Sequence, residues 1–174
     1  MKDTRPRMPS PKKLASFEPG MLYWEVVDPV WDAVDIYNGG DEFLATFTPV
    51  HRSQGLLLAA HWCQSEVCNG GFHQFFLNPT GVLAPEAILG FKLLEMRGAA
   101  TLALKAASKF GPRYPRDQDT REPMLDRLTA AVKSRTRWSP FEAIDEAFFK
   151  LPEIDRFGEH ADAFVRKNLS VFFR

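Results

Sequence analysis

Apolar side chains recur along most of this chain at intervals of three and four residues, the spacing that places them on one face of an α-helix. The pattern predicts helices over residues 29–37, 50–68, 85–96, 99–110, 124–134, 140–150 and 158–172. Only Phe43–Thr48 is a candidate strand, and it is short. We therefore expect an all-α fold, a single-domain irregular bundle of six to eight helices.

Proline and glycine mark where several of these helices begin and end. Asp28-Pro29 and Ser139-Pro140 each place a capping residue before a proline at the first helical position. Gly39-Gly40 and Gly111-Pro112 follow the last apolar residues of their helices and should stop them. The first predicted helix therefore begins at Asp28-Pro29 and ends before Gly39-Gly40.

The most informative part of the sequence is residues 66–78, called the corner segment below. The run that leads into it is apolar on nearly all sides, as in a helix at the centre of a bundle. Asn69-Gly70-Gly71 then supplies residues that tolerate a positive φ and can redirect the chain. Phe72, Phe75 and Phe76 would share one face of a short second helix. The segment thus predicts a tight corner held by aromatic rings, with polar side chains beside it.

Residues 1–20 differ from the rest of the chain in their four prolines and clustered basic side chains. We expect a flexible, basic, proline-rich arm over residues 1–20, attached to a helical domain over residues 21–174. Such an arm serves most simply to keep a protein soluble, and alternatively it could attract nucleic acid.

The chain has 22 basic and 22 acidic residues, but the charges are unevenly distributed. Residues 28–42, called the acidic segment below, contain five carboxylates and no basic residue. The simplest explanation is a solvated surface, with Asp32 and Asp35 near a helix N-terminus where the dipole favours negative charge. The alternative is a surface that meets a basic protein partner. For that role the candidate residues are Asp32, Asp35, Asp41 and Glu42.

A basic stretch over residues 97–116 offers a different interpretation. It contains Arg97, Lys105, Lys109, Arg113 and Arg116, which could meet phosphates or an acidic partner. No helix with base-reading side chains stands out, so a solvated helix face is the simpler explanation and direct nucleic-acid binding is disfavoured.

We find no catalytic signature in the sequence and expect no cofactor. His61, Cys63, Cys68 and His73 invite a zinc interpretation, but Cys63 and Cys68 would lie about 140° apart around a helix, so we expect no metal. An enzyme with an unrecognised site near His61, Glu66, His73 and Gln74 is the alternative kept open. The sequence has no run of 18 uncharged apolar residues and no apolar signal-peptide core near Met1, which predicts a cytoplasmic protein without a membrane span.

The corner segment also identifies a resemblance. Its pattern, Glu66-x-x-Asn69-Gly70-Gly71-Phe72-x-Gln74-Phe75-Phe76-x-Asn78, is similar to a bacterial family of DNA-mimic-like proteins, a domain-of-unknown-function family. The likeness covers about residues 30–172 and continues at Pro85-Glu86-Ala87 and Phe164-Val165-x-x-Asn168. It implies an all-α, non-catalytic cytoplasmic protein. The family's mimic is a strongly acidic dimer that binds a transcription factor in place of DNA, whereas this chain has no net charge.

The resemblance assigns the corner residues a structural role, in which their amides and carboxylate satisfy backbone groups left open at helix ends. It also leads to our first functional hypothesis, a non-enzymatic binding or regulatory protein that occludes a protein partner with a basic surface, such as a nucleic-acid-binding protein or a toxin. The oligomeric state is left open, including a homodimer.

Overall fold

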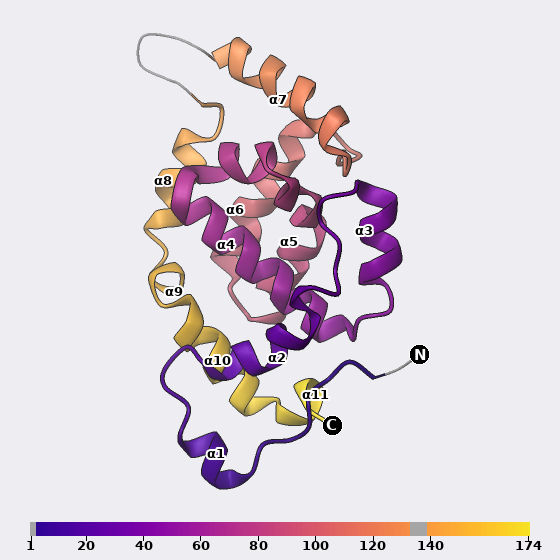
Figure 1. The fold of residues 1–174 in the computed structure, drawn as a ribbon. Helices are drawn as coiled ribbons and strands as arrows, with labels where there is room; N and C mark the ends of the chain where they lie inside the picture. The colour runs from indigo at the N-terminus through magenta and orange to yellow at the C-terminus, as the bar shows by residue number, and fades with distance from the viewer. Residues whose placement is uncertain (1–2, 133–138) are drawn as a thin grey trace.

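The computed structural model describes residues 3–132 and 139–174, and all regular structure within them is helical (Figure 1). Eight of the helices have seven residues or more, which confirms the predicted all-α bundle. The α-helices are α1 Pro11–Ala15, α2 Leu22–Trp31, α3 Gly40–Phe47, α4 Arg52–Leu77, α5 Ala84–Leu93, α6 Arg97–Ala107, α7 Gln118–Val132, α8 Glu142–Phe149, α9 Pro152–Asp155, α10 Phe157–Lys167 and α11 Leu169–Phe172. Two 3₁₀ turns, η1 Pro79–Leu83 and η2 Ser108–Phe110, complete the order.

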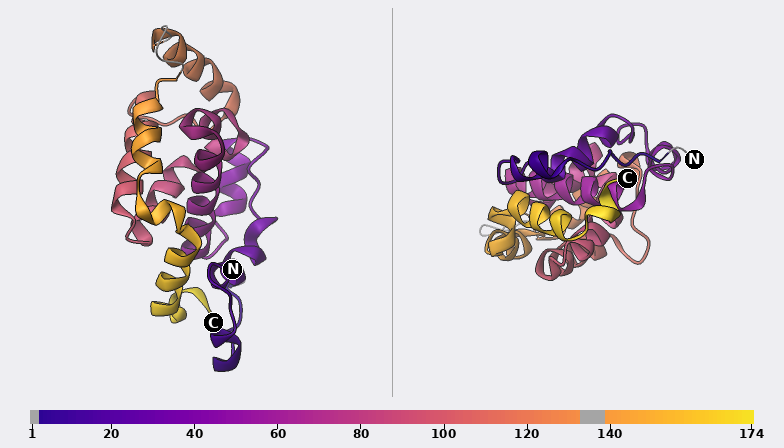
Figure 2. Two further views of the ribbon diagram at one scale, coloured as in Figure 1. Left: turned by 90° about the vertical axis from the view of Figure 1, so that its left-hand side faces the viewer. Right: turned by 90° about the horizontal axis from the view of Figure 1, so that it is seen from below.

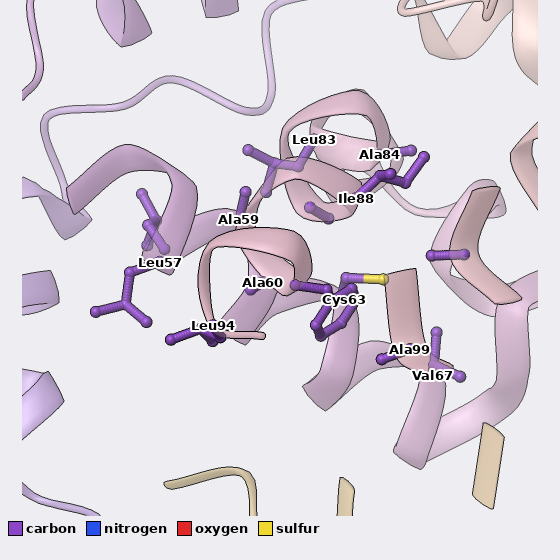
Figure 3. Packing of buried hydrophobic residues seen from close by; sticks show 14 of the residues in the cluster. Leu57, Ala59, Ala60, Cys63, Val67, Leu83, Ala84, Ile88, Leu94 and Ala99 are labelled. Atoms are coloured by element: carbon purple, nitrogen blue, oxygen red, sulfur yellow. The ribbon is translucent and has the colours of Figure 1, made fainter. Parts of the chain in front are cut away.

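Helix α4 is the centre of the bundle and contacts α2, α5, α7 and α8. Residues 54–60 are buried on all sides, as the continuous apolar run predicted. Figure 3 shows Ala60 and Cys63 of α4 beside Ile88 and Ala99 from α5 and α6. An added Cβ at Gly90 of α5 would overlap the carbonyl oxygen of Leu56 on α4, and it would lie 2.9 Å from the Cβ of Ala60. Small residues therefore bring α4 and α5 into close contact.

The first of the predicted helices, over residues 29–37, corresponds to α2 and does not begin where the sequence predicted. Helix α2 starts at Leu22 and ends at Trp31, and Pro29 lies inside its last turns. A proline costs a helix one backbone hydrogen bond, but Pro29 is exposed and near the end, where that loss matters least. Burial of Tyr23 and Val27 on the α4 side stabilises the earlier turns. Residues 32–39 form a loop instead of the predicted second half of the helix.

The candidate strand at residues 43–48 is wrong, because residues 43–47 belong to helix α3 and Thr48 is its C-cap. Phe43 and Phe47 are four residues apart, and their ring centroids lie 5.0 Å from each other on one side of the helix. The Gly40 N–H at the start of α3 donates to Asp117 Oδ1 over 2.7 Å. A long-range cap and a helical aromatic pair therefore decide the local conformation.

The N-terminal residues are hydrogen-bonded to the rest of the chain, whereas the sequence predicted a flexible arm. Thr4 Oγ1 donates to Gln54 Oε1 over 2.6 Å and accepts from the His51 N–H over 2.9 Å. The Met8 N–H donates to the carbonyl of Arg174, and the Arg174 N–H donates to the carbonyl of Pro6. Residues 6–8 therefore lie beside the C-terminal residue of the chain (Figure 1).

Several later boundaries agree with the sequence. The structure confirms a helix opening at Ala84 with Pro85 in its first turn, and a stop at Gly111, which has a φ of 98°. Helix α7 begins six residues earlier than predicted, and its predicted end at Ser134 falls outside the described residues. In residues 3–132 and 139–174, no helix is both long and apolar enough to cross a bilayer.

Candidate functional site

The corner segment bends α4 at Gly70 and Gly71. Gly70 has φ −156° and ψ 21°, and Gly71 has φ 75° and ψ 177°, so Gly71 takes the positive φ that the sequence predicted. The N–H of Phe72 after the bend donates to Asp145 Oδ1 of α8 over 2.8 Å. Burial raises the pKa of Asp145, and this hydrogen bond opposes that shift. Asp145, from a different helix, thus stabilises the bend in α4, and no local sequence signal indicated this role.

The three aromatic rings of the corner fill its inner side. Phe72, Phe75 and Phe76 are each at most 1% exposed. The Phe76 ring packs edge-on against Phe110 with centroids 4.9 Å apart, and Phe72 packs edge-on against Phe148 at 5.3 Å. Edge-to-face pairs of this kind add about 0.5–1.5 kcal/mol beyond the buried area. The apolar face of the corner is therefore part of the core.

The polar side chains of the corner segment hydrogen-bond to one another. Glu66 Oε2 accepts a hydrogen bond from Gln74 Nε2 over 3.0 Å and another from Asn78 Nδ2 over 2.8 Å. We predicted that these groups satisfy open backbone groups at helix ends, and that prediction is wrong. The reason is geometric, since the bend at Gly70-Gly71 turns Gln74 and Asn78 back toward Glu66. Asn69 stays exposed.

Arg121 is a buried cation that the sequence did not single out. Its side chain is fully buried and donates to the carbonyls of Phe76, Asn78 and Arg116 over 2.6, 2.9 and 2.6 Å. Burial lowers the pKa of its guanidinium. These carbonyls lie where α4 ends and α7 begins, so Arg121 takes the backbone-satisfying role expected of the corner amides.

Three residues of the alternative enzyme site, His61, Glu66 and Gln74, belong to two separate sets of contacts. His61 Nδ1 lies 3.1 Å from the Tyr23 hydroxyl, and its ring packs against Trp24 at 4.8 Å. Glu66 and Gln74 bond each other. Burial lowers the pKa of His61 to about 4, which leaves it neutral at pH 7. This geometry joins His61 to an aromatic cluster, and among the described residues no carboxylate is hydrogen-bonded to it for acid–base work.

The depressed pKa of His61 predicts an acid-sensitive fold. Histidine titrates near 6.5 when unfolded, so stability is full above that pH and is lost as pH falls toward about 4. We expect a loss of about 2 kcal/mol between pH 7.5 and pH 5, from the free energy that each pKa unit represents. Urea unfolding at a series of pH values would measure it. In the control His61→Phe, which keeps an aromatic ring, this slope should flatten, and an unchanged slope would contradict the assignment.

The two cysteines do not converge. Cys63 is buried in the core, while Cys68 is exposed and accepts from Gln64 Nε2 over 3.3 Å. Burial raises the pKa of the Cys63 thiol, which disfavours the thiolate that zinc requires. Within the described ranges, no group of three or more His, Cys, Asp or Glu side chains is placed to hold a metal ion. The absence of a metal stays a prediction.

The acidic segment connects α2 to α3 and lies on one side of α4, with α5 and α6 on the other (Figure 2). We predicted that Asp32 lies near a helix N-terminus, and that prediction is wrong. Asp32 is the C-cap of α2, where the negative end of the helix dipole adds to the negative potential of its carboxylate. Asp41 and Glu42 are exposed in the first turn of α3. Together with exposed Asp28, these side chains make no ion pair with the described residues.

Asp35 differs from its neighbours because it organises the loop. Its carboxylate accepts from Asn38 Nδ2 over 2.6 Å and from the backbone N–H groups of Tyr37 and Asn38. These hydrogen bonds, with the Asn38 side chain contributing most, lower the pKa of Asp35. Asp35 is therefore a structural residue of the acidic segment as well as a charge.

The basic stretch is partly used inside the protein. Arg116 donates to both Glu86 carboxylate oxygens, over 2.8 and 2.7 Å, and lies 5.2 Å from the centroid of the Phe43 ring. In the N-terminal region, Arg5 pairs with Asp3 and Lys13 with Glu25. These pairs reduce the free positive charge available for phosphates.

Comparison with known proteins adds one finding to this geometry. A family model described as DMP19-like protein matches residues 49–168. The match contains the corner segment, Asp145 and Arg121, whereas the acidic segment precedes it. Neither the curated proteins nor the solved structures gave a match to this chain.

Proposed function

The chain belongs to the family of DMP19-like proteins, and we propose that it is a non-enzymatic binding protein that occludes the basic surface of a protein partner. A nucleic-acid-binding protein fits this role best, because its basic surface would otherwise meet phosphates. A basic toxin has the same chemistry. The DNA-mimic character of the family supports this reading.

The main support for this proposal is that the acidic segment has exposed carboxylates without ion-pair partners among the described residues. Asp28, Asp32, Asp41 and Glu42 are exposed and make no ion pair with other described residues. The C-terminal end of α2 points toward Asp32, and its dipole makes the local potential more negative. A basic partner would be steered to this surface although the whole chain is neutral.

We expect reversal of two of these charges to slow partner binding without unfolding the protein. Asp32→Lys combined with Asp41→Lys should lower the association rate about tenfold or more, because steering raises on-rates by that order. Because a positive charge at a helix C-terminus interacts favourably with the helix dipole, Asp32→Lys should not destabilise α2. Asp35 is left unchanged because its hydrogen bonds order the loop. The partner would be isolated from native cells with the wild-type protein and its association rate measured by interferometry at several salt concentrations.

The matched control is Asp126→Lys with Glu146→Lys, which makes the same charge change at exposed positions on α7 and α8. This variant should associate nearly as fast as the wild type. An association rate that ignores both salt and the Asp32/Asp41 reversal would show that the partner binds elsewhere.

A further inference from the structure

A small pocket lies where α2, the loop that follows it and α4 meet. Its volume is about 210 Å³, below the roughly 300–1,000 Å³ of typical small-molecule sites and suited to one side chain. Its walls combine aromatic rings, aliphatic side chains and two carboxylates. The lining residues are Trp31, Asp32, Val34, Asp35, Ile36, Tyr37, Leu58 and Trp62.

The aromatic walls are held by different parts of the chain. Trp31 of α2 and Trp62 of α4 stack with ring centroids 4.6 Å apart and an interplanar angle of 26°. Trp24 packs on Trp31 at 5.2 Å, which further fixes this indole. Tyr37 is 72% exposed, and no ring among the described residues packs against it. The exposed Tyr37 ring is therefore open to pack against a side chain that enters the pocket.

The carboxylates make the pocket negative. Asp35 is held in place by hydrogen bonds from Asn38 and from the Tyr37 N–H, which stabilise its charged form. The Asp32 carboxylate has no hydrogen-bond or ion-pair partner among the described residues and lies at the negative end of the α2 dipole. None of the described residues that line the pocket is basic. Two negative charges beside π faces, that of Asp35 held in place by its hydrogen bonds, are complementary to a flat cation.

We propose that this pocket receives an arginine side chain of the basic partner, an inference that rests on the function proposed above. A guanidinium is planar, stacks on aromatic faces and can donate two parallel hydrogen bonds to a carboxylate. A lysine ammonium is a compact and more strongly hydrated charge, and it gains less from the rings. The pocket thus makes the acidic segment selective for arginine over lysine, where charge alone would accept both.

Two octapeptides, oligo-arginine and oligo-lysine, test the proposal because they carry the same formal charge. We expect the wild type to bind oligo-arginine at least about fivefold more tightly at low salt, within the range of cation–π contributions. Tyr37→Leu, which removes the exposed ring but keeps an apolar side chain, should lower oligo-arginine affinity about fivefold and leave oligo-lysine affinity nearly unchanged. Calorimetry measures the affinities, and indole N–H resonances of Trp31 and Trp62 should shift with oligo-arginine.

Phe149→Leu is the matched control, because it removes another exposed ring, 43% exposed, from helix α8. It should preserve the arginine preference. Equal affinity for the two peptides, or an arginine preference that survives Tyr37→Leu, would overturn the proposed arginine pocket. The role of the acidic segment would still be supported in that case if Asp32→Lys with Asp41→Lys lowers the affinity for both peptides. Failure of both peptides to bind at low salt would overturn the acidic segment and the pocket together.

Discussion

Replacing Arg121 with methionine is expected to destabilise the fold by about 4 kcal/mol, the largest effect of any single change considered. The guanidinium is fully buried and donates to the carbonyls of Phe76, Asn78 and Arg116. Methionine fills a similar volume but donates no hydrogen bond, so the carbonyls of Phe76 and Arg116 lose the Arg121 donor in a buried site, while the Asn78 carbonyl keeps the Gly81 N–H. Each buried unsatisfied acceptor costs about 1–3 kcal/mol. Urea unfolding followed by circular dichroism would measure the loss.

Two further variants separate the hydrogen bonds from general effects. Arg127→Met changes an exposed arginine on the same helix and should alter stability by less than about 0.5 kcal/mol. Arg121→Lys keeps the charge but cannot reproduce the planar fork of donors, so it should recover only part of the loss. If Arg121→Met were as stable as Arg127→Met, the bonds to these carbonyls would not hold the α4–α7 junction.

Gly71→Val is expected to cost about 3 kcal/mol, because it combines backbone strain with a steric conflict. Gly71 has a φ of 75°, which a β-branched residue adopts only with strain. An added Cβ would also lie 2.8 Å from Asp145 Oδ2. Relief of that contact requires Asp145 to move, which weakens its hydrogen bond to the Phe72 N–H. The free energy of unfolding in urea gives the cost directly.

Gly111→Val isolates the strain from the steric conflict. Gly111 has a φ of 98°, but an added Cβ there would meet nothing within 4 Å. It should therefore be the milder of the two substitutions. Equal stability of Gly71→Val and the wild type would refute the role of the bend.

The corner segment shows how far local patterns reach. Asn69-Gly70-Gly71 indicated a bend with a positive φ, and Phe72, Phe75 and Phe76 indicated one buried face. Both features depend on residues within a few positions of each other, and the structure has both. The polar contacts around the same bend were misread, because Glu66 and Asn78 are twelve residues apart and meet only after the chain has turned.

The acidic segment shows where sequence reasoning was weakest. Asp28-Pro29 has the form of a helix start, yet α2 begins at Leu22, seven residues before Pro29, and ends at Trp31. Local capping preferences are worth about 1 kcal/mol, less than burial of one side of a helix against α4. The loop after α2 and the pocket beside it follow from that tertiary contact. Neither could be predicted from the residue types alone.

The sequence by itself determined the helical content, the central place of α4, the bend at Gly71 and the uneven charge. These properties depend on short spacings along the chain, which helical geometry converts directly into shared faces. The tertiary structure alone decided that Asp145 meets Phe72 across 73 positions, that Arg121 reaches Phe76 across 45, and that Trp31 stacks on Trp62. Such pairs leave no periodic signal, because they depend on how separate helices pack and not on the conformation of either one.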